Sequence, residues 1–367
     1  MSVHHLVTSL AAAALAAAGV PAPGDQPPIT LRQSGGFPVG GKTVANPANP
    51  AQHLSCDHGY VEYFIPEHRR NASLVMWHSS SAQVWQNRWD GGEGFKDMFL
   101  RRGYPVYLWD GPRVGRANWG CEQYNYIPIY RDEQNFKSWN FGASYPNWWP
   151  DVQFPTDDEG AWQRATRARY AEFDHLANVQ LQAEAAAAAA DSGKLGDRIV
   201  YLTNSAGGLR AMLATTKTQG SNIAAIVAYE SIGYVFPIGD PESPPLCTDL
   251  QACGFGPVGV PVDDFKKLAK LAAIQFVWGD NRLEEGPNAK ADVAMSRLAA
   301  RLINKYGGNA EVLKLGEIGL KGSTHIPFAD LDNARVGELL DAFLSKNGLD
   351  GYPGGEKGGR WVWQPDE

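Results

Sequence analysis

The sequence predicts an α/β fold in which a mostly parallel central sheet carries helices on both faces. Short apolar runs rich in β-branched and aromatic residues alternate with segments of helical spacing along most of the 367 residues. Hydrophobic residues make up 44% of the chain and charged residues 20%, which is typical of a globular protein with a sizeable core. The stretch Arg198–Arg210 passes directly from a predicted buried strand into a predicted helix.

The N-terminal segment has the features of a secretory signal. Residues 6–20 form an apolar, alanine-rich run that is too short to span a bilayer comfortably, and Pro21 and Pro23 end any helix. Small residues near these prolines offer cleavage sites. Residues 1–5 carry no Lys or Arg, so an N-terminal alanine-rich helix is the alternative. We expect a signal peptide over residues 1–22 and a secreted protein.

One domain is expected to follow over residues 23–347, with a glycine-rich C-terminal tail over residues 348–367. Residues 24–57 are rich in Gly, Pro and Asn, which predicts short strands separated by tight turns at Gly35-Gly36 and Gly40-Gly41. Later apolar runs predict strands over residues 60–65, 73–77, 104–109, 199–202, 223–229, 273–278 and 311–315. Helical spacing and good helix formers predict helices over residues 95–102, about 158–190, 209–214, 289–306 and 332–346.

Two insertions interrupt this alternation. Residues 115–156 carry many Trp, Tyr and Phe side chains among Asn, Gly and Pro, without clear periodicity. A long aromatic insertion of this kind favours a lid over a site, with Trp139, Trp148 and Trp149 as substrate-binding residues. An aromatic core that only covers the sheet is the alternative. The second insertion, about residues 234–262, is rich in Pro and Gly.

The cysteines also indicate export. Cys56, Cys121, Cys247 and Cys253 are even in number, and an exported protein can oxidise them into two disulfides. Of the three possible pairings we favour Cys247 with Cys253, because they bracket a short Pro/Gly-rich loop; this leaves Cys56 with Cys121. Asn71 begins an Asn-Ala-Ser sequon in a polar turn, and is a glycosylation site only where the host glycosylates.

Ser205 lies in the motif with the clearest chemistry. An apolar run precedes it, and Gly207 and Gly208 follow it directly. Glycines are expected there, because the strand and the helix approach each other too closely for side chains. Such a turn aims the backbone N–H of Ala206 at the space above Ser205, where an oxyanion would develop. The stretch resembles the G-x-S-x-G nucleophile elbow of the α/β-hydrolase superfamily, with Thr203 in place of the first glycine. An ordinary turn with a hydrogen-bonded serine is the alternative.

A serine nucleophile needs a base and a carboxylate that orients the base. In α/β-hydrolases the chain order is serine, acid, histidine. His325 lies in a Gly/Ser/Thr loop after the last predicted strand and is the expected base; a surface-loop histidine is the alternative. For the acid we favour Glu230, which breaks an apolar run, over Asp280, which can cap the following turn. The position three residues beyond Gly279, where many of these enzymes carry the acid, is Arg282.

Four segments carry a more specific resemblance: Trp77–Ser81, Asp90–Phe95, Phe99–Tyr104 and Asp110–Arg116. With them, the layout resembles the esterase 713-like subgroup of bacterial secreted esterases, whose acid is a glutamate after the sixth strand. The similarity runs from about residue 35 to residue 343. It implies that a second oxyanion donor is the backbone N–H of Ser80.

Several other functions are not expected. The net charge of −7 argues against nucleic acid or an anionic membrane as the main partner. After the N-terminal run no stretch is long and apolar enough for a membrane span, and no metal-ligand motif occurs. Gly254–Gly259 matches G-x-G-x-x-G, but no strand precedes it and Pro257 lacks an N–H, so we expect no dinucleotide and no cofactor.

The sequence therefore predicts a serine hydrolase that cleaves a carboxylic ester or lactone, a small-molecule substrate, through Ser205, His325 and Glu230. One alternative is an enzyme of the same fold that catalyses elimination or cyclisation on a bulky natural product. Another is a non-catalytic binding protein of that fold. Such proteins usually lack the nucleophile or the base, so the presence of Ser205 and His325 counts against it.

Overall fold

A computed structural model describes residues 26–79, 81–125, 127–171, 176–247, 255–281 and 287–355. Within them eight strands form one sheet in the order β1-β2-β4-β3-β7-β8-β11-β12, and the six strands from β4 to β12 run parallel. Their bounds are β1 Leu31–Asn46, β2 Asn49–Pro66, β3 Ser73–His78, β4 Val106–Asp110, β7 Ile199–Asn204, β8 Ile223–Tyr229, β11 Ala273–Trp278 and β12 Ala310–Lys314. The mostly parallel sheet confirms the predicted fold class.

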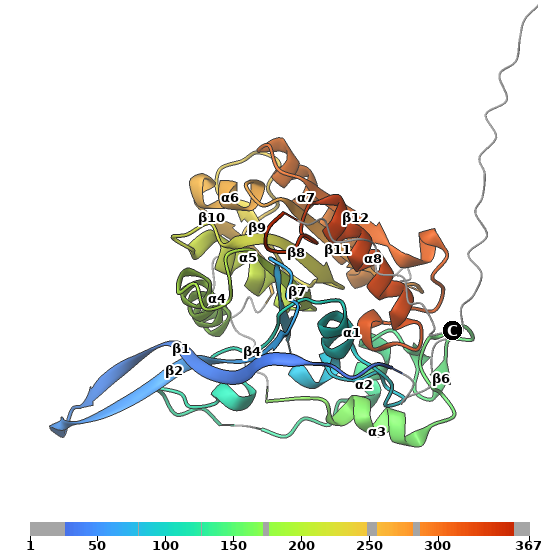
Figure 1. Cartoon of the computed structure of the whole chain (residues 1–367), viewed down its shortest axis with the longest axis horizontal. Helices are drawn as coiled ribbons and strands as arrows, with labels where there is room; N and C mark the ends of the chain where they lie inside the picture. Colours follow the sequence, from blue (N-terminus) through green and yellow to red (C-terminus); the bar gives the residue numbers. More distant parts are fainter. Residues whose placement is uncertain are drawn as a thin grey trace, which may run out of the picture.

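Helices cover both faces of this sheet (Figure 1). One face packs against α4 (Leu176–Asp191), α5 (Gly207–Lys217), α6 (Val262–Ala269) and α7 (Pro287–Lys305). The other face packs against α1 (Phe95–Arg101), α3 (Glu159–Arg167) and α8 (Asn333–Lys346). Strands β3, β4, β7 and β11 are buried along their whole length, because both of their faces are covered. This burial explains why the sequence shows each of them as a short, mostly apolar run.

The N-terminal strands differ from the prediction. Strands β1 and β2 form one long antiparallel ribbon, whose far end projects beyond the rest of the molecule (Figure 1). Gly35 and Gly36 therefore lie inside a strand and not in a turn. A Cβ added at Gly35 would lie 2.8 Å from the hydroxyl oxygen of Tyr63, and one at Gly59 would lie 2.4 Å from the ring of Trp109. These glycines make room for aromatic rings that lie across the ribbon.

The aromatic insertion between β4 and α4 has a small core of its own. It contains α2 (Asp132–Ser138), the short pair β5 (Gly142–Ser144) and β6 (Asn147–Trp148), and then α3. Trp148 stacks on Phe154 with ring centroids 5.0 Å apart and meets Phe136 edge-on at 4.6 Å. Trp89 contacts Phe154 at 6.0 Å and so joins this cluster to the main domain. The insertion is thus packed on itself and on one edge of the site described below.

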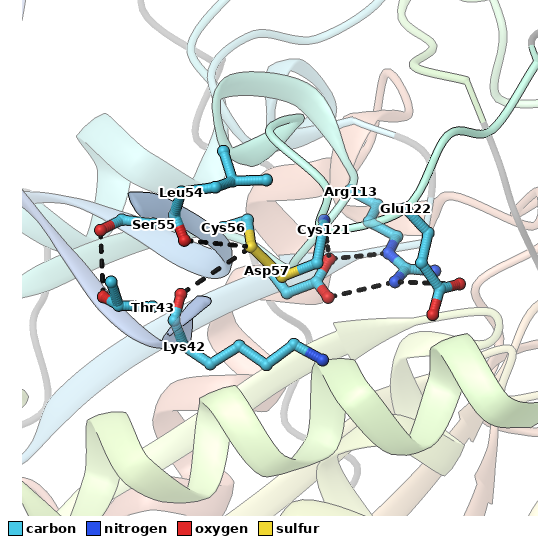
Figure 2. Close-up of a disulfide and its surroundings, with 9 residues drawn as sticks. All are labelled: Lys42, Thr43, Leu54, Ser55, Cys56, Asp57, Arg113, Cys121 and Glu122. Atoms are coloured by element: carbon cyan, nitrogen blue, oxygen red, sulfur yellow. Dashed lines mark hydrogen bonds and ion pairs between the residues drawn. A yellow bond between two sulfur atoms is a disulfide. The ribbon is translucent and has the colours of Figure 1, made fainter. Parts of the chain in front are cut away.

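A disulfide ties the insertion to the ribbon (Figure 2). Cys56 of β2 is bonded to Cys121 across 65 residues of chain, as the sequence predicts. Beside it Asp57 accepts hydrogen bonds from Arg113 at 2.8 and 3.1 Å and from the backbone N–H of Cys121 at 3.2 Å. Although burial opposes it, the hydrogen bond from Arg113 holds the pKa of Asp57 below its usual value. The bond and the ion pair fix the start of the insertion.

Some predicted features lie wholly or partly outside the residues that the structure describes. The proposed signal peptide, residues 1–22, lies outside them, as does Cys253, although Cys247 is disulfide-bonded. The insertion after β8 holds β9 (Tyr234–Pro237) and β10 (Pro257–Val260), which pair in parallel. The start of the predicted tail is docked, since the Asp350 and Gly351 carbonyls accept hydrogen bonds from Arg70 and Asn71.

Asn71, the proposed glycosylation site, is exposed, and its Nδ2 atom donates to the carbonyl of Tyr352 at 2.9 Å. The following Ser73 of the sequon is buried in β3. Among the described helices, none combines the length and the apolar character that a membrane crossing needs.

Candidate active site

Ser205, Glu230 and His325 lie at one edge of the sheet. Ser205 follows the carboxyl end of β7, Glu230 follows the carboxyl end of β8, and His325 lies in the loop between β12 and α8. Carboxyl ends of parallel strands share an edge, so residues far apart in the chain are brought together there. All three are buried: Ser205 is 8% exposed, His325 6% and Glu230 0%.

The turn at Ser205 requires the two glycines that follow it. A Cβ at Gly207 would lie 2.6 Å from the Trp77 carbonyl oxygen, and one at Gly208 would lie 2.0 Å from the hydroxyl of Ser231. Ser205 itself has φ +55°, a strained left-handed conformation for a residue with a side chain. Its backbone N–H donates to the carbonyl of Tyr229 at 3.1 Å. The sharp turn therefore presents the Ser205 side chain at the sheet edge.

Thr203, the departure from the G-x-S-x-G pattern, fits because it lies in the strand. β7 stays paired with its neighbours through Asn204, so Thr203 has extended backbone that suits a β-branched residue. β7 ends at Asn204, so the tight turn begins at Ser205, two residues beyond the position of the first motif glycine. Ala206, the proposed oxyanion donor, is the N-cap of α5 and lies at the positive end of its helix dipole.

Glu230 contacts the imidazole of His325. Its Oε2 atom lies 3.2 Å from Nδ1 of the ring, and its Oε1 atom accepts the backbone N–H of Gly279 at 2.5 Å. Glu230 also has a left-handed backbone, with φ +50°, and its N–H donates to the Val277 carbonyl at 2.7 Å. A fully buried carboxylate held at both oxygens can fix the orientation of one ring.

Asp280, the alternative acid, makes different contacts. Its Oδ2 atom accepts the backbone N–H of Gly322 at 3.0 Å, and Lys321 lies 3.8 Å from Oδ1. Its backbone carbonyl accepts a hydrogen bond from Asn140 at 2.5 Å. These contacts stabilise the loop that precedes His325. The geometry thus favours Glu230 as the partner of the ring.

Backbone contacts hold His325 from two further sides. Its N–H donates to the carbonyl of Trp139 at 2.9 Å, which brings the aromatic insertion to the site. Its carbonyl accepts the Nδ2 hydrogen bond of Asn204 at 2.7 Å, and Asn204 also donates to the Tyr229 carbonyl at 3.2 Å. Asn204 is not among the site residues predicted from the sequence, because its role follows from contacts that only the folded chain creates.

The loop after β3 borders the same edge. Ser80, the proposed second oxyanion donor, lies outside the described residues, but both of its neighbours are buried. Arg210 of α5 donates to the Ser79 carbonyl at 3.3 Å. Ser81 accepts the N–H of Gln83 at 3.1 Å and so caps the short 3-10 helix Ala82–Trp85. A hydrogen bond therefore connects α5, the helix that begins after Ser205, with the loop after β3.

The three tryptophans proposed for substrate binding occupy different places. Trp139 reaches the site through its backbone contact with His325. Trp148 packs in the aromatic core of the insertion. Trp149 donates its indole N–H to the Asn140 side chain at 3.3 Å. All three are partly exposed, and Trp139 is the one that the structure connects to His325.

This sheet order, with a strand–turn–helix at Ser205 and an acid and a histidine on the following connections, defines the α/β-hydrolase fold. The chain has that fold. A bacterial esterase of known structure superposes with a TM-score of 0.69 at 22% identity, covering 89% of this chain and 99% of that one. The chain is also 25% identical over 332 residues to a probable secreted lipase, phiG, of Fungal sp. (strain ATCC 74256), covering 78% of this chain and 85% of that protein. No protein-family model matches the chain.

Proposed function

We propose that this protein is a secreted serine hydrolase that cleaves a carboxylic ester or lactone through Ser205, His325 and Glu230. The observation that carries the proposal is the buried contact of 3.2 Å between Glu230 and His325, at the sheet edge where the strained turn presents Ser205. An acid, an imidazole and a hydroxyl in this arrangement are the parts that nucleophilic acyl transfer needs.

In the first half of the reaction the Ser205 oxygen attacks the carbonyl carbon and its proton passes to His325. The N–H of Ala206, and by resemblance that of Ser80, stabilise the resulting oxyanion. The tetrahedral intermediate collapses, the bond to the leaving oxygen breaks, and His325 returns the proton to that oxygen. Water then attacks the acyl-enzyme with His325 as the base. The bond between the acyl carbon and the Ser205 oxygen breaks, and His325 returns the proton to that oxygen as the carboxylic acid leaves. Glu230 orients the imidazole and stabilises its charged form in each half.

Four observations support the ester substrate, the secreted location and the lid. The relative found by sequence is named a probable secreted lipase, and the similar structure is that of a bacterial esterase. The disulfide between Cys56 and Cys121 fits an oxidising compartment. The aromatic insertion touches His325 through Trp139 and fits the role of a lid that sets the size of the acyl group.

The test is labelling with a fluorophosphonate, followed by peptide mass spectrometry. Wild-type protein should lose esterase activity and carry the label on Ser205. Ser205→Ala should take no label, whereas Ser231→Ala should be labelled normally, because Ser231 is a second buried serine beside the turn and serves as the matched control. Label on another residue, or no inactivation, refutes the proposed nucleophile. Turnover in ¹⁸O-water should place one heavy oxygen in the acid, which separates hydrolysis from elimination or cyclisation.

A further inference from the structure

The loop that carries His325 is held by a buried acid outside the three proposed catalytic residues. Asp330 follows the short 3-10 helix Pro327–Ala329 and is fully buried. Its two carboxylate oxygens accept hydrogen bonds from Thr324: one from the backbone N–H at 2.7 Å and one from the hydroxyl at 2.8 Å. Thr324 is the residue directly before His325, so Asp330 binds the chain at the point where the histidine begins.

The Thr324 hydroxyl extends this connection past the histidine. A hydroxyl has one proton to donate and free lone pairs to accept. Because the Asp330 carboxylate accepts that proton, the Thr324 oxygen is left to accept the backbone N–H of Ile326, which lies 3.1 Å away. The residues on either side of His325 are therefore joined to each other and to one carboxylate.

These contacts complete the support of the His325 backbone. Trp139 accepts its N–H, and Asn204 donates to its carbonyl, as described above. With Thr324 and Ile326 also fixed, the side-chain torsions are the remaining freedom of the histidine. Glu230 then selects the ring orientation. Positioning of a general base within a fraction of an ångström is what such support can provide.

An acid is an expensive residue to bury for stability alone. Burial raises the pKa of Asp330 well above its usual value, and the nearby Asp332 adds to the shift. Hydrogen bonds from Thr324 act in the opposite direction. Residues that oppose folding in this way concentrate where function requires them.

We propose that Asp330 is a positioning residue for His325, acting through the backbone and hydroxyl of Thr324. The inference rests on the proposed function, because it assigns Asp330 a role in keeping the histidine aligned with Ser205. It predicts that loosening the Asp330–Thr324 contact slows the chemical step and leaves substrate binding unchanged.

The experiment compares Asp330→Asn, Thr324→Val and Thr324→Ser. Thr324→Val removes the hydroxyl at almost constant volume, whereas Thr324→Ser keeps it and should restore the rate. Asp330→Asn and Thr324→Val should each lower kcat by about 10- to 100-fold with unchanged KM, because small displacements of a reacting group have effects of this order. The rate of fluorophosphonate labelling of Ser205 should fall in parallel. The double variant should be no slower than the slower single variant, since both remove one contact.

Asp332→Asn is the control, because Asp332 is a partly buried acid on the same connection and makes no hydrogen bond to the histidine loop among the described contacts. It should keep wild-type kcat. Folded Asp330→Asn and Thr324→Val proteins with normal kcat, even with a lowered melting temperature, overturn the inference. If Asp330→Asn does not fold, the Thr324 pair decides alone. Wild-type protein that neither hydrolyses esters nor takes the label refutes the proposed function itself, and this inference falls with it.

Discussion

Glu230 and His325 are 95 residues apart in the chain, yet the Oε2 atom of one lies 3.2 Å from the Nδ1 atom of the other. The second oxygen of Glu230 is held by the N–H of Gly279, from the loop after the next strand of the sheet. Three connections of the sheet therefore converge on one carboxylate. Because of this convergence, variants of Glu230 and Asp280 should differ clearly in activity, which tests which residue is the acid.

Glu230→Gln should lower kcat by several orders of magnitude, up to about 10⁴-fold, because the amide keeps the shape of the side chain but loses the charge that stabilises the imidazolium. Asp280→Asn should have a much smaller effect, since Asp280 holds the N–H of Gly322 and an amide oxygen can do the same. Steady-state kinetics on a chromogenic ester measure both.

Thermal melts must first show that both variants are folded. Loss of turnover in Asp280→Asn together with an active Glu230→Gln would move the acid to the connection after β11. The proposed roles of Ser205 and His325 would be unaffected by that result.

Removing the bond between Cys56 and Cys121 should destabilise the protein. The bond closes 65 residues, and chain-entropy arguments assign such a loop an upper value of about 4 kcal/mol. A Cys56→Ser, Cys121→Ser double variant should melt at a lower temperature and be cut first by proteases in the insertion. Ser55→Ala, at an exposed neighbouring position, is the control. An unchanged melting temperature would mean that the insertion is held by its other contacts.

Asp332 should make stability depend on pH. Burial raises its pKa to about 6, so between pH 4 and 6 the folded protein keeps a proton that the unfolded chain releases. Its contribution to stability is therefore lost as pH rises through this range. Asp332→Asn should melt higher than wild type at pH 7.5, with no difference near pH 4. Glu67→Gln, which replaces an exposed acid, should show no such pH-dependent difference in melting temperature. Parallel curves for Asp332→Asn and wild type would contradict the shift.

The tryptophans of the insertion should separate into two roles. Trp148→Ala should lower the free energy of unfolding by up to about 3 kcal/mol, because Trp148 packs against Phe136 and Phe154. Trp139→Ala should change the preference among acyl chain lengths, because the Trp139 side chain is partly exposed and the Trp139 backbone contacts His325. Denaturant titration and an ester panel measure the two effects. A selectivity change in Trp148→Ala without loss of stability would assign that residue to the substrate instead.

Much of the fold could be predicted because its strands are buried on both faces. Strands β8 and β11 have the predicted bounds, since each is a mostly apolar run that is followed by a polar or glycine residue. A strand over residues 60–65 was predicted and lies in β2, but the long continuous ribbon of β1 and β2 was not predicted. Glycine is common both in turns and in strands covered by aromatic rings, and the residues that decide between them, such as Tyr63 for Gly35, lie on another strand.

The candidate site likewise contains residues that the sequence could indicate and residues that only the folded structure reveals. Ser205 and Glu230 stand directly after strands, where a sequence pattern can indicate them, and His325 follows from chain order. Asn204 and Asp330 have roles only through contacts that the folded chain creates. Asn204 reaches a carbonyl 121 residues away, and Asp330 is an ordinary turn residue until its burial is known.

Ser205 and Glu230 have left-handed backbone conformations, so two residues proposed for catalysis also lower the thermal stability of the protein. Each strained residue costs about 1–3 kcal/mol, and glycine is the residue that relieves such strain. Ser205→Gly should therefore melt at a higher temperature than Ser205→Ala, and the proposed role of Ser205 predicts that both variants are inactive. Selection for heat resistance alone would favour loss of the proposed nucleophile, so a search for more heat-resistant variants must screen for turnover at every round.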